Sequence, residues 1–159
     1  MSAQPPIFEE PRNAQGLRIA VVAARFNNHV VERLLDGATG SLRGAGAATA
    51  DVEVLRVPGA FEIPLAVRQA ARSGRFEAVI ALGAVIRGET SHFDYVAGEC
   101  ARGVMQVMLD SGVPVGFGVL TCDTLAQAEA RAGGAAGNKG ADAARAAVEM
   151  ANLLRQWTH

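Results

Sequence analysis

The chain alternates between short, almost continuous apolar runs and longer segments in which apolar residues recur every three or four positions. The short runs have the length and character of strands that are buried on both faces of a sheet, and the longer segments have the period of amphipathic helices. Strands are predicted over residues 18–24, 51–57, 78–85 and 113–122. Helices are predicted over residues 28–45, 62–73, 91–111, 124–132 and 138–157.

Local signals support several of these boundaries. Pro64 falls in the first turn of its helix, where proline is tolerated. Ser91 and Asp94 have the spacing of a capping box at the start of the helix that follows the third strand. Because strands and helices alternate four times, we expect an α/β fold: one domain of three layers, with helices on both faces of a four-stranded parallel sheet.

The first sixteen residues differ from the rest. Residues 1–16 are polar and contain three prolines, which predicts a tail in front of a domain spanning residues 17–159. Ile7 and Phe8 could form a short extended piece that pairs with a neighbouring molecule. The tail has neither the basic nor the apolar region of a secretory signal.

Composition narrows the class of protein. A chain of 159 residues that is 50% hydrophobic and 19% charged should fold without disulfides or metals. Its net charge of -1 provides no basic surface for nucleic acid or membranes. Cys100 and Cys122 lack CxxC spacing and have apolar neighbours, so we expect buried free thiols in a reducing compartment. A cytoplasmic protein without membrane-spanning helices follows.

Three unusual loops follow the first three strands, at residues 25–27, 58–62 and 87–92. Ligands of open parallel sheets bind beyond the carboxyl ends of the strands. The loops should therefore bring Phe26, Phe61, a carboxylate and a histidine together. Such a site suits a flat aromatic ligand with a hydroxylated arm, beside a separate anion.

The third loop combines a glycine, hydroxyls, Arg87 and His92 at the start of a helix, where unpaired N–H groups favour an anion. His92 could be a proton shuttle beside that anion, or merely a first-turn residue in contact with solvent. Phe26 could likewise lie in the site or in the core at the end of a strand.

Other kinds of site are poorly supported. No GxGxxG follows the first strand, and the glycine-rich run at residues 133–140 lacks P-loop spacing and follows a helix. His29, His92 and His159 are not spaced for zinc, and no GxSxG elbow occurs. The only lysine, Lys139, is either functional or a surface charge near a helix start, and Arg131 alone says little.

Four motifs, in their order and spacing, identify a family. ARFN, PGAFEIP, GAVIRGETSHFDYV and AGNKGADAA resemble lumazine synthase over residues 17–154. The resemblance implies a flavodoxin-like fold and the penultimate reaction of riboflavin biosynthesis. In that reaction 5-amino-6-(D-ribitylamino)uracil condenses with 3,4-dihydroxy-2-butanone 4-phosphate to give 6,7-dimethyl-8-ribityllumazine, phosphate and water, without cofactor or metal.

The resemblance also assigns roles to residues. His92 would transfer protons, and Glu89 and Thr90 would hold the phosphate. The pyrimidine and its ribityl chain would contact Phe26, Ala60, Phe61, Glu62, Ala84, Val85 and Ile86. A neighbouring subunit would supply Phe117 to the ring and Arg131 and Lys139 to the phosphate end.

Assembly follows from the same resemblance. Members of the family form pentamers with active sites between subunits, and some close into hollow shells. The short connection over residues 133–138 resembles that of shell-forming members, which favours a sixty-subunit shell over a free pentamer. Two alternatives to an active enzyme are a shell-forming protein with little catalysis and a flavin- or lumazine-binding module of the same fold.

Overall fold

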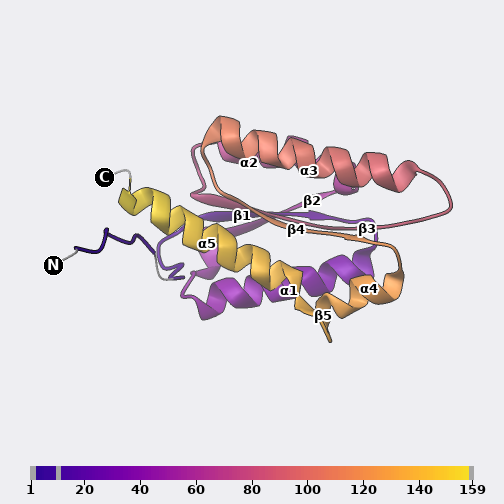
Figure 1. The fold of residues 1–159 in the computed structure, drawn as a ribbon, viewed down its shortest axis with the longest axis horizontal. Coiled ribbons are helices and arrows are strands. Elements are labelled where there is room, and N and C mark those ends of the chain that lie inside the picture. The colour runs from indigo at the N-terminus through magenta and orange to yellow at the C-terminus, as the bar shows by residue number, and fades with distance from the viewer. Residues whose placement is uncertain (1–2, 10–11, 158–159) are drawn as a thin grey trace.

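The computed structural model describes residues 3–9 and 12–157 and has three layers (Figure 1). Four parallel strands form the central sheet in the order β2-β1-β3-β4. The strands are β1 (Ile19–Ala24), β2 (Val52–Val57), β3 (Ala78–Ile86) and β4 (Val115–Cys122). The principal helices are α1 (Asn28–Gly44), α2 (Ile63–Arg72), α3 (His92–Ser111), α4 (Leu125–Ala130) and α5 (Lys139–Trp157).

Helices cover both faces of the sheet, as predicted. Figure 1 shows α2 and α3 above the strands and α1 and α5 below them. The apolar core is correspondingly divided into two clusters, one on each face, and all six residues of β1 are buried. No polar or charged residue of the described chain is fully buried. The strand order and the two helical layers confirm the flavodoxin-like fold.

The α5 layer lies unusually close to its neighbours because two glycines leave room for backbone. A Cβ on Gly116 would lie 2.1 Å from the Ala143 carbonyl oxygen, and a Cβ on Gly140 would lie 2.1 Å from that of Leu34. Asn138 fastens the start of the helix. Its Oδ1 accepts hydrogen bonds from the N–H groups of Gly140 and Ala141, and its Nδ2 donates to the Arg33 carbonyl oxygen in α1.

The predicted capping box at the start of α3 is wrong. Ser91 precedes the helix but makes no side-chain capping hydrogen bond. The Asp94 carboxylate lies instead 3.4 Å from the Arg87 guanidinium, and the His92 N–H is bonded to the Thr90 hydroxyl. The structure has a capping box at α4, where Thr124 and Gln127 bond each other's backbone N–H groups.

Two further details differ from the sequence prediction. The glycine-rich connection contains a small antiparallel pair, β5 (Ala132–Gly134) and β6 (Gly137–Asn138). Short 3-10 turns at Thr49–Asp51 and Ala60–Glu62 also precede β2 and α2. Both features depend on local backbone turns that hydrophobic periodicity does not indicate.

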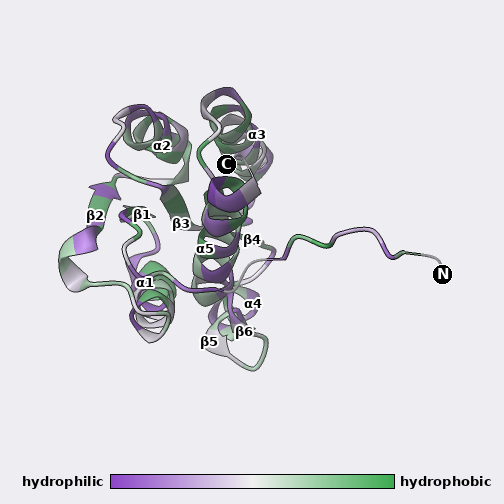
Figure 2. Cartoon of the chain, turned by 90° about the vertical axis from the view of Figure 1, so that its left-hand side faces the viewer, coloured by the Kyte–Doolittle hydropathy of each residue, from purple (hydrophilic) through white to green (hydrophobic). Residues whose placement is uncertain are grey.

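Part of the N-terminal segment is attached to the domain. Ala14 is fully buried in the core and donates its N–H to the Ala45 carbonyl oxygen at 2.9 Å. Residues 3–9 have no regular secondary structure, Ile7 is 80% exposed, and the segment extends away from the domain (Figure 2). The remaining tail residues, 1–2 and 10–11, lie outside the described part of the chain.

The two cysteines are buried and free, as expected. Burial raises the pKa of the Cys100 thiol to about 12, so this thiol stays protonated at neutral pH. Among residues 3–9 and 12–157, no helix has both the length and the apolar character needed to cross a bilayer.

Candidate functional site

A pocket of about 740 Å³ lies at the carboxyl ends of the strands, between the sheet and α3. It is lined by the loops that follow β1, β2 and β3 and by the first turn of α3. Its walls include Phe26, Asn27, Pro58, Gly59, Ala60, Phe61, Glu62, Ala84, Val85, Ile86, Gly88, Thr90, His92, Phe93, Tyr95 and Val96. The three loops that the sequence singled out therefore do meet in one pocket.

Two phenylalanines stand at the mouth of this pocket. Phe26 is 72% exposed and Phe61 is 62% exposed, although both are large apolar side chains. Backbone bonds fasten the first of these loops to the second: the Phe26 N–H donates to the Pro58 carbonyl oxygen at 3.0 Å. The interpretation of Phe26 as a core residue is therefore wrong, and its ring is free to stack on a flat ligand.

The pocket floor comes from the end of β3. Ala84 and Val85 are buried and Ile86 is half-buried. Asn27, which the sequence analysis did not name as a site residue, adopts a left-handed conformation with φ 60°. Asparagine tolerates that region better than most residues, and here its Nδ2 donates to the Ala84 carbonyl oxygen at 2.8 Å. One side chain thus joins the ends of β1 and β3.

The far end of the pocket is the start of α3. His92 is the first residue of the helix and is exposed. Its N–H lies 3.3 Å from the Thr90 Oγ1, so the hydroxyl and the imidazole belong to one short turn. An exposed helix start presents N–H groups and a positive dipole end to an anion. The corner can therefore hold an anion within reach of a proton carrier.

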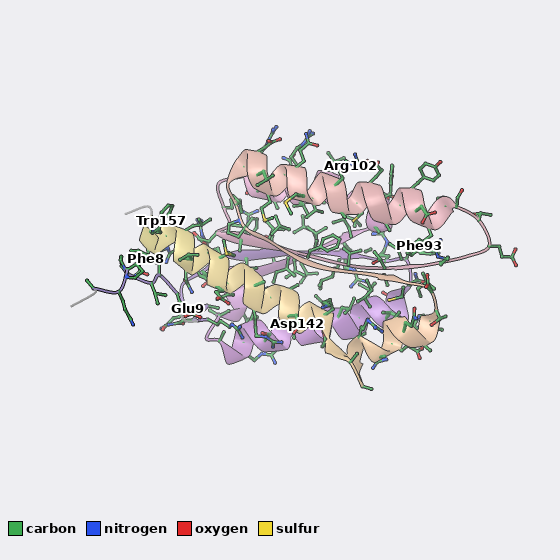
Figure 3. The ribbon with its side chains drawn as sticks, viewed as in Figure 1. Phe8, Glu9, Phe93, Arg102, Asp142 and Trp157 are labelled. Carbon is green, nitrogen blue, oxygen red and sulfur yellow. The ribbon has the colours of Figure 1, made fainter. Side chains whose placement is uncertain are left out.

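Arg87 is engaged inside its own chain. Its Nε lies 2.9 Å from the Asp123 Oδ1, and a second guanidinium nitrogen lies 3.4 Å from the Asp94 Oδ1. The guanidinium also lies over the Phe93 ring, 4.4 Å from its centroid. Figure 3 labels Phe93 beneath the first turn of α3. The hydrogen bond to Asp123 raises the pKa of Arg87, which is charged at every accessible pH.

Four predicted site residues lie outside this pocket. Glu89 is exposed in the loop before α3, beside the pocket-lining Gly88 and Thr90. Phe117, in the outer strand β4, is 38% exposed. Arg131 ends α4, with one guanidinium N–H donated to the Gln127 carbonyl oxygen at 3.0 Å. Lys139 begins α5, and its Nζ lies 3.9 Å from the Asp142 Oδ2.

No cluster of metal-ligating side chains occurs within residues 3–9 and 12–157. His29 and His92 lie in different helices, α1 and α3, and His159 lies outside the described residues. The groups that line the pocket include the rings of Phe26, Phe61, Phe93 and Tyr95, the Glu62 carboxylate, the Thr90 hydroxyl and the His92 imidazole.

Sequence comparisons agree with this geometry. The family model for 6,7-dimethyl-8-ribityllumazine synthase matches residues 16–155. The chain is 58% identical to the 6,7-dimethyl-8-ribityllumazine synthase of Halorhodospira halophila (strain DSM 244 / SL1), over 89% of this chain and 91% of that one. It is 55% identical to the 6,7-dimethyl-8-ribityllumazine synthase of Anaeromyxobacter sp. (strain Fw109-5), over 94% of this chain and 92% of that one. It is 53% identical to the 6,7-dimethyl-8-ribityllumazine synthase of Syntrophus aciditrophicus (strain SB), over 96% of this chain and 99% of that one. The chain belongs to the 6,7-dimethyl-8-ribityllumazine synthase family.

Proposed function

We propose that this chain is a transferase that condenses 5-amino-6-(D-ribitylamino)uracil with 3,4-dihydroxy-2-butanone 4-phosphate, in the pocket between β1, β2, β3 and α3. The products are 6,7-dimethyl-8-ribityllumazine, phosphate and water. The observation that carries the proposal is the pocket itself, which joins two exposed aromatic rings to a helix start bearing a histidine.

The pyrimidine and its ribityl chain occupy the strand ends in this proposal. Phe26 stacks on the ring, while Ala84, Val85 and Ile86 line its edge through backbone and apolar groups. The loop after β2 holds the hydroxylated chain, with Ala60, Phe61 and Glu62 as its contacts. All seven residues line the pocket, which supports this assignment.

The phosphate occupies the start of α3. Thr90 and Glu89 cradle it together with the backbone N–H groups of the turn, and His92 gives and takes the protons. Imine formation, phosphate elimination, tautomerisation and ring closure all need such transfers. Proton transfer by a side chain is worth roughly 10²–10⁴ in rate. Holding the two substrates together can supply about 7–11 kcal/mol, so positioning dominates.

A neighbouring subunit completes the site. Phe117 of that subunit covers the ring, and its Arg131 and Lys139 approach the phosphate. The exposure of all three side chains, and their absence from the pocket of their own chain, support this arrangement. Subunits that share sites in this way form a pentamer. The short β5–β6 turn suits the closure of twelve such pentamers into a sixty-subunit shell.

Residues 17–159 form the catalytic domain in this proposal and residues 1–16 a tail. A cytoplasmic location fits the two free cysteines, because reducing compartments keep thiols unpaired. The tail segment around Ile7 and Phe8 is extended, exposed and available to a neighbour.

The test is a mixture of purified protein with both substrates, followed by the absorbance of the lumazine product. Saturable formation of the product at stoichiometric phosphate release is expected. Tight binding of lumazine or flavin without turnover would instead identify a binding module. Light scattering on the same sample distinguishes a pentamer from a closed shell.

A further inference from the structure

Arg87 lies between the pocket-lining residues Ile86 and Gly88, and the proposed chemistry gives it no role. It follows the last residue of β3, and its N–H donates to the Cys122 carbonyl oxygen at 2.9 Å. Its side chain then turns toward the first turn of α3 and the end of β4. One residue therefore contacts three segments that meet at the phosphate end of the site.

The contacts of Arg87 hold both ends of the loop over residues 88–91. At one end its backbone is bonded to β4. At the other end its guanidinium contacts Asp94 and Phe93, which lie in the helical turn that begins with His92. Because Phe93 and His92 both line the pocket, the guanidinium sets where that turn lies relative to the sheet.

Asp123 anchors the guanidinium from the side of β4. The Asp123 N–H donates at 2.8 Å to the Oε1 of Gln127. Gln127 belongs to the capping box of α4. The backbone that carries the Asp123 carboxylate is thus bonded to a defined helix start. A fixed carboxylate can hold the planar guanidinium in one orientation, as Arg–carboxylate pairs do.

Arg87 also balances negative charge. Asp94 and Asp123 are both exposed carboxylates within 3.4 Å and 2.9 Å of its nitrogens. Without the guanidinium, both carboxylates would lose this compensating charge, and Asp94 lies only two positions after the pocket-lining His92. Uncompensated negative charges close to an anion site weaken anion binding.

We propose that Arg87 is a positioning residue for the phosphate-bearing substrate, acting through Asp123, Asp94 and Phe93 without contacting the phosphate. The inference rests on the proposed function, since it concerns the same anion site. Arg87 fixes the turn that carries Thr90 and His92 and neutralises the two carboxylates beside it.

The experiment compares R87M, R87K, D123N and the double variant R87M/D123N with the wild type. Arg102→Met is the matched control, because Arg102 is an exposed arginine of α3 whose ion pair, with Glu99, is local to that helix. For each protein, KM for each substrate and kcat are measured, together with assembly by light scattering and Tm. Calorimetric titration with inorganic phosphate measures the anion site without turnover.

R87M should raise KM for the butanone phosphate and the Kd for inorganic phosphate by about tenfold or more, as expected for loss of a charged hydrogen bond. KM for the pyrimidine should change by less than about twofold, as for distant independent groups. R87K should recover part of the loss, and R87M/D123N should be no worse than R87M, because the two residues act as one unit. Arg102→Met should match the wild type.

Three outcomes would overturn the proposal. An equal rise in both KM values with a lower Tm would reduce Arg87 to a structural role. Unchanged or tighter phosphate binding in D123N would make Arg87 a direct phosphate ligand that Asp123 restrains. Unchanged phosphate binding in R87M would show that Arg87 has no role at the phosphate site. Failure of the wild type to form lumazine would refute the proposed function alone, because the phosphate titrations still decide the role of Arg87.

Discussion

The side-chain amide of Asn27 donates a hydrogen bond to the carbonyl oxygen of Ala84, and so joins the carboxyl ends of β1 and β3 beneath the pocket. The two residues lie 57 positions apart in the chain. Asn27 achieves this in a left-handed backbone conformation, directly after the aromatic residue that we assign to the pyrimidine. The bond therefore fixes two walls of the pocket relative to one another.

Asn27→Gly should weaken pyrimidine binding more than it weakens the fold. Glycine adopts the left-handed conformation without strain, so the substitution removes the hydrogen bond and keeps the backbone. We expect KM for the pyrimidine to rise about five- to tenfold, corresponding to a neutral hydrogen bond of about 1 kcal/mol. Steady-state kinetics with the phosphate substrate held saturating provides the measurement.

Asn27→Ala is the companion variant. It loses the same bond and adds backbone strain of about 1 kcal/mol at positive φ, so it should also lower the denaturation midpoint. Equal KM values for Asn27→Gly and the wild type would show that the bond does not shape the pyrimidine site.

Replacing His92 by alanine should slow turnover without abolishing it. Loss of a proton-transfer group should lower kcat by about 10², the lower end of the range for such groups, because positioning of the two substrates persists. Stopped-flow measurement of lumazine formation checks this value. His29→Asn is a suitable control, since His29 is an exposed residue of α1 outside the pocket. Complete inactivity with both substrates still bound would contradict the prediction.

Arg131→Ala should act on one substrate. If Arg131 approaches the phosphate of the adjacent site, KM for the butanone phosphate should rise by about tenfold or more, while KM for the pyrimidine stays close to that of the wild type. Arg131→Lys should retain part of the effect but lose the forked geometry. Arg155→Ala, in the last turn of α5, serves as control. An unchanged KM for the phosphate-bearing substrate would exclude Arg131 from the site.

Glu77 should make stability depend on acid pH. Burial alone would raise the pKa of this carboxyl, but hydrogen bonds from the Arg18 side chain and backbone outweigh burial and lower it. Stabilisation from a lowered pKa is present above the ordinary value of about 4.5 and is lost as pH falls through the folded value. Glu77→Gln should therefore reduce the free energy of unfolding by about 1 kcal/mol at pH 7.

The loss caused by Glu77→Gln should shrink as pH falls below 4.5, because the wild-type carboxyl then also loses its charge. This difference in the free energy of unfolding is measured by urea titrations at a fixed protein concentration, repeated across the acid range. Glu99→Gln, in the exposed pair with Arg102, should change stability less. A Glu77→Gln loss that stays constant with pH would rule out the charged pair as its source.

The sheet could be predicted because its strands carry the signal locally. β1 and β3 are buried on both faces, so they are apolar without interruption, and their helices repeat at the expected period. The carboxyl-end rule then predicts that Phe26, Phe61 and His92 meet in one pocket. The motif resemblance supplied the individual roles.

Other features depend on contacts between distant residues, which periodicity does not encode. Ser91 and Asp94 have capping-box spacing, yet the Asp94 carboxylate lies close to Arg87, whose guanidinium is also bound by Asp123, 36 positions further along the chain. Asn27 has no signal of its own in the sequence, since its acceptor Ala84 belongs to another strand. Asn138 likewise joins α5 to α1 through Arg33, more than a hundred positions away.

The separation of Arg131 and Lys139 from the pocket of their own chain has a genetic consequence. If each site combines His92 of one chain with Arg131 of the next, a variant defective in one residue keeps the other half-site intact. Chains carrying His92→Ala and chains carrying Arg131→Ala, when co-expressed, will form some interfaces in which both contributions are wild type. Co-expression of the two alleles would then give more lumazine than either allele alone, as intragenic complementation.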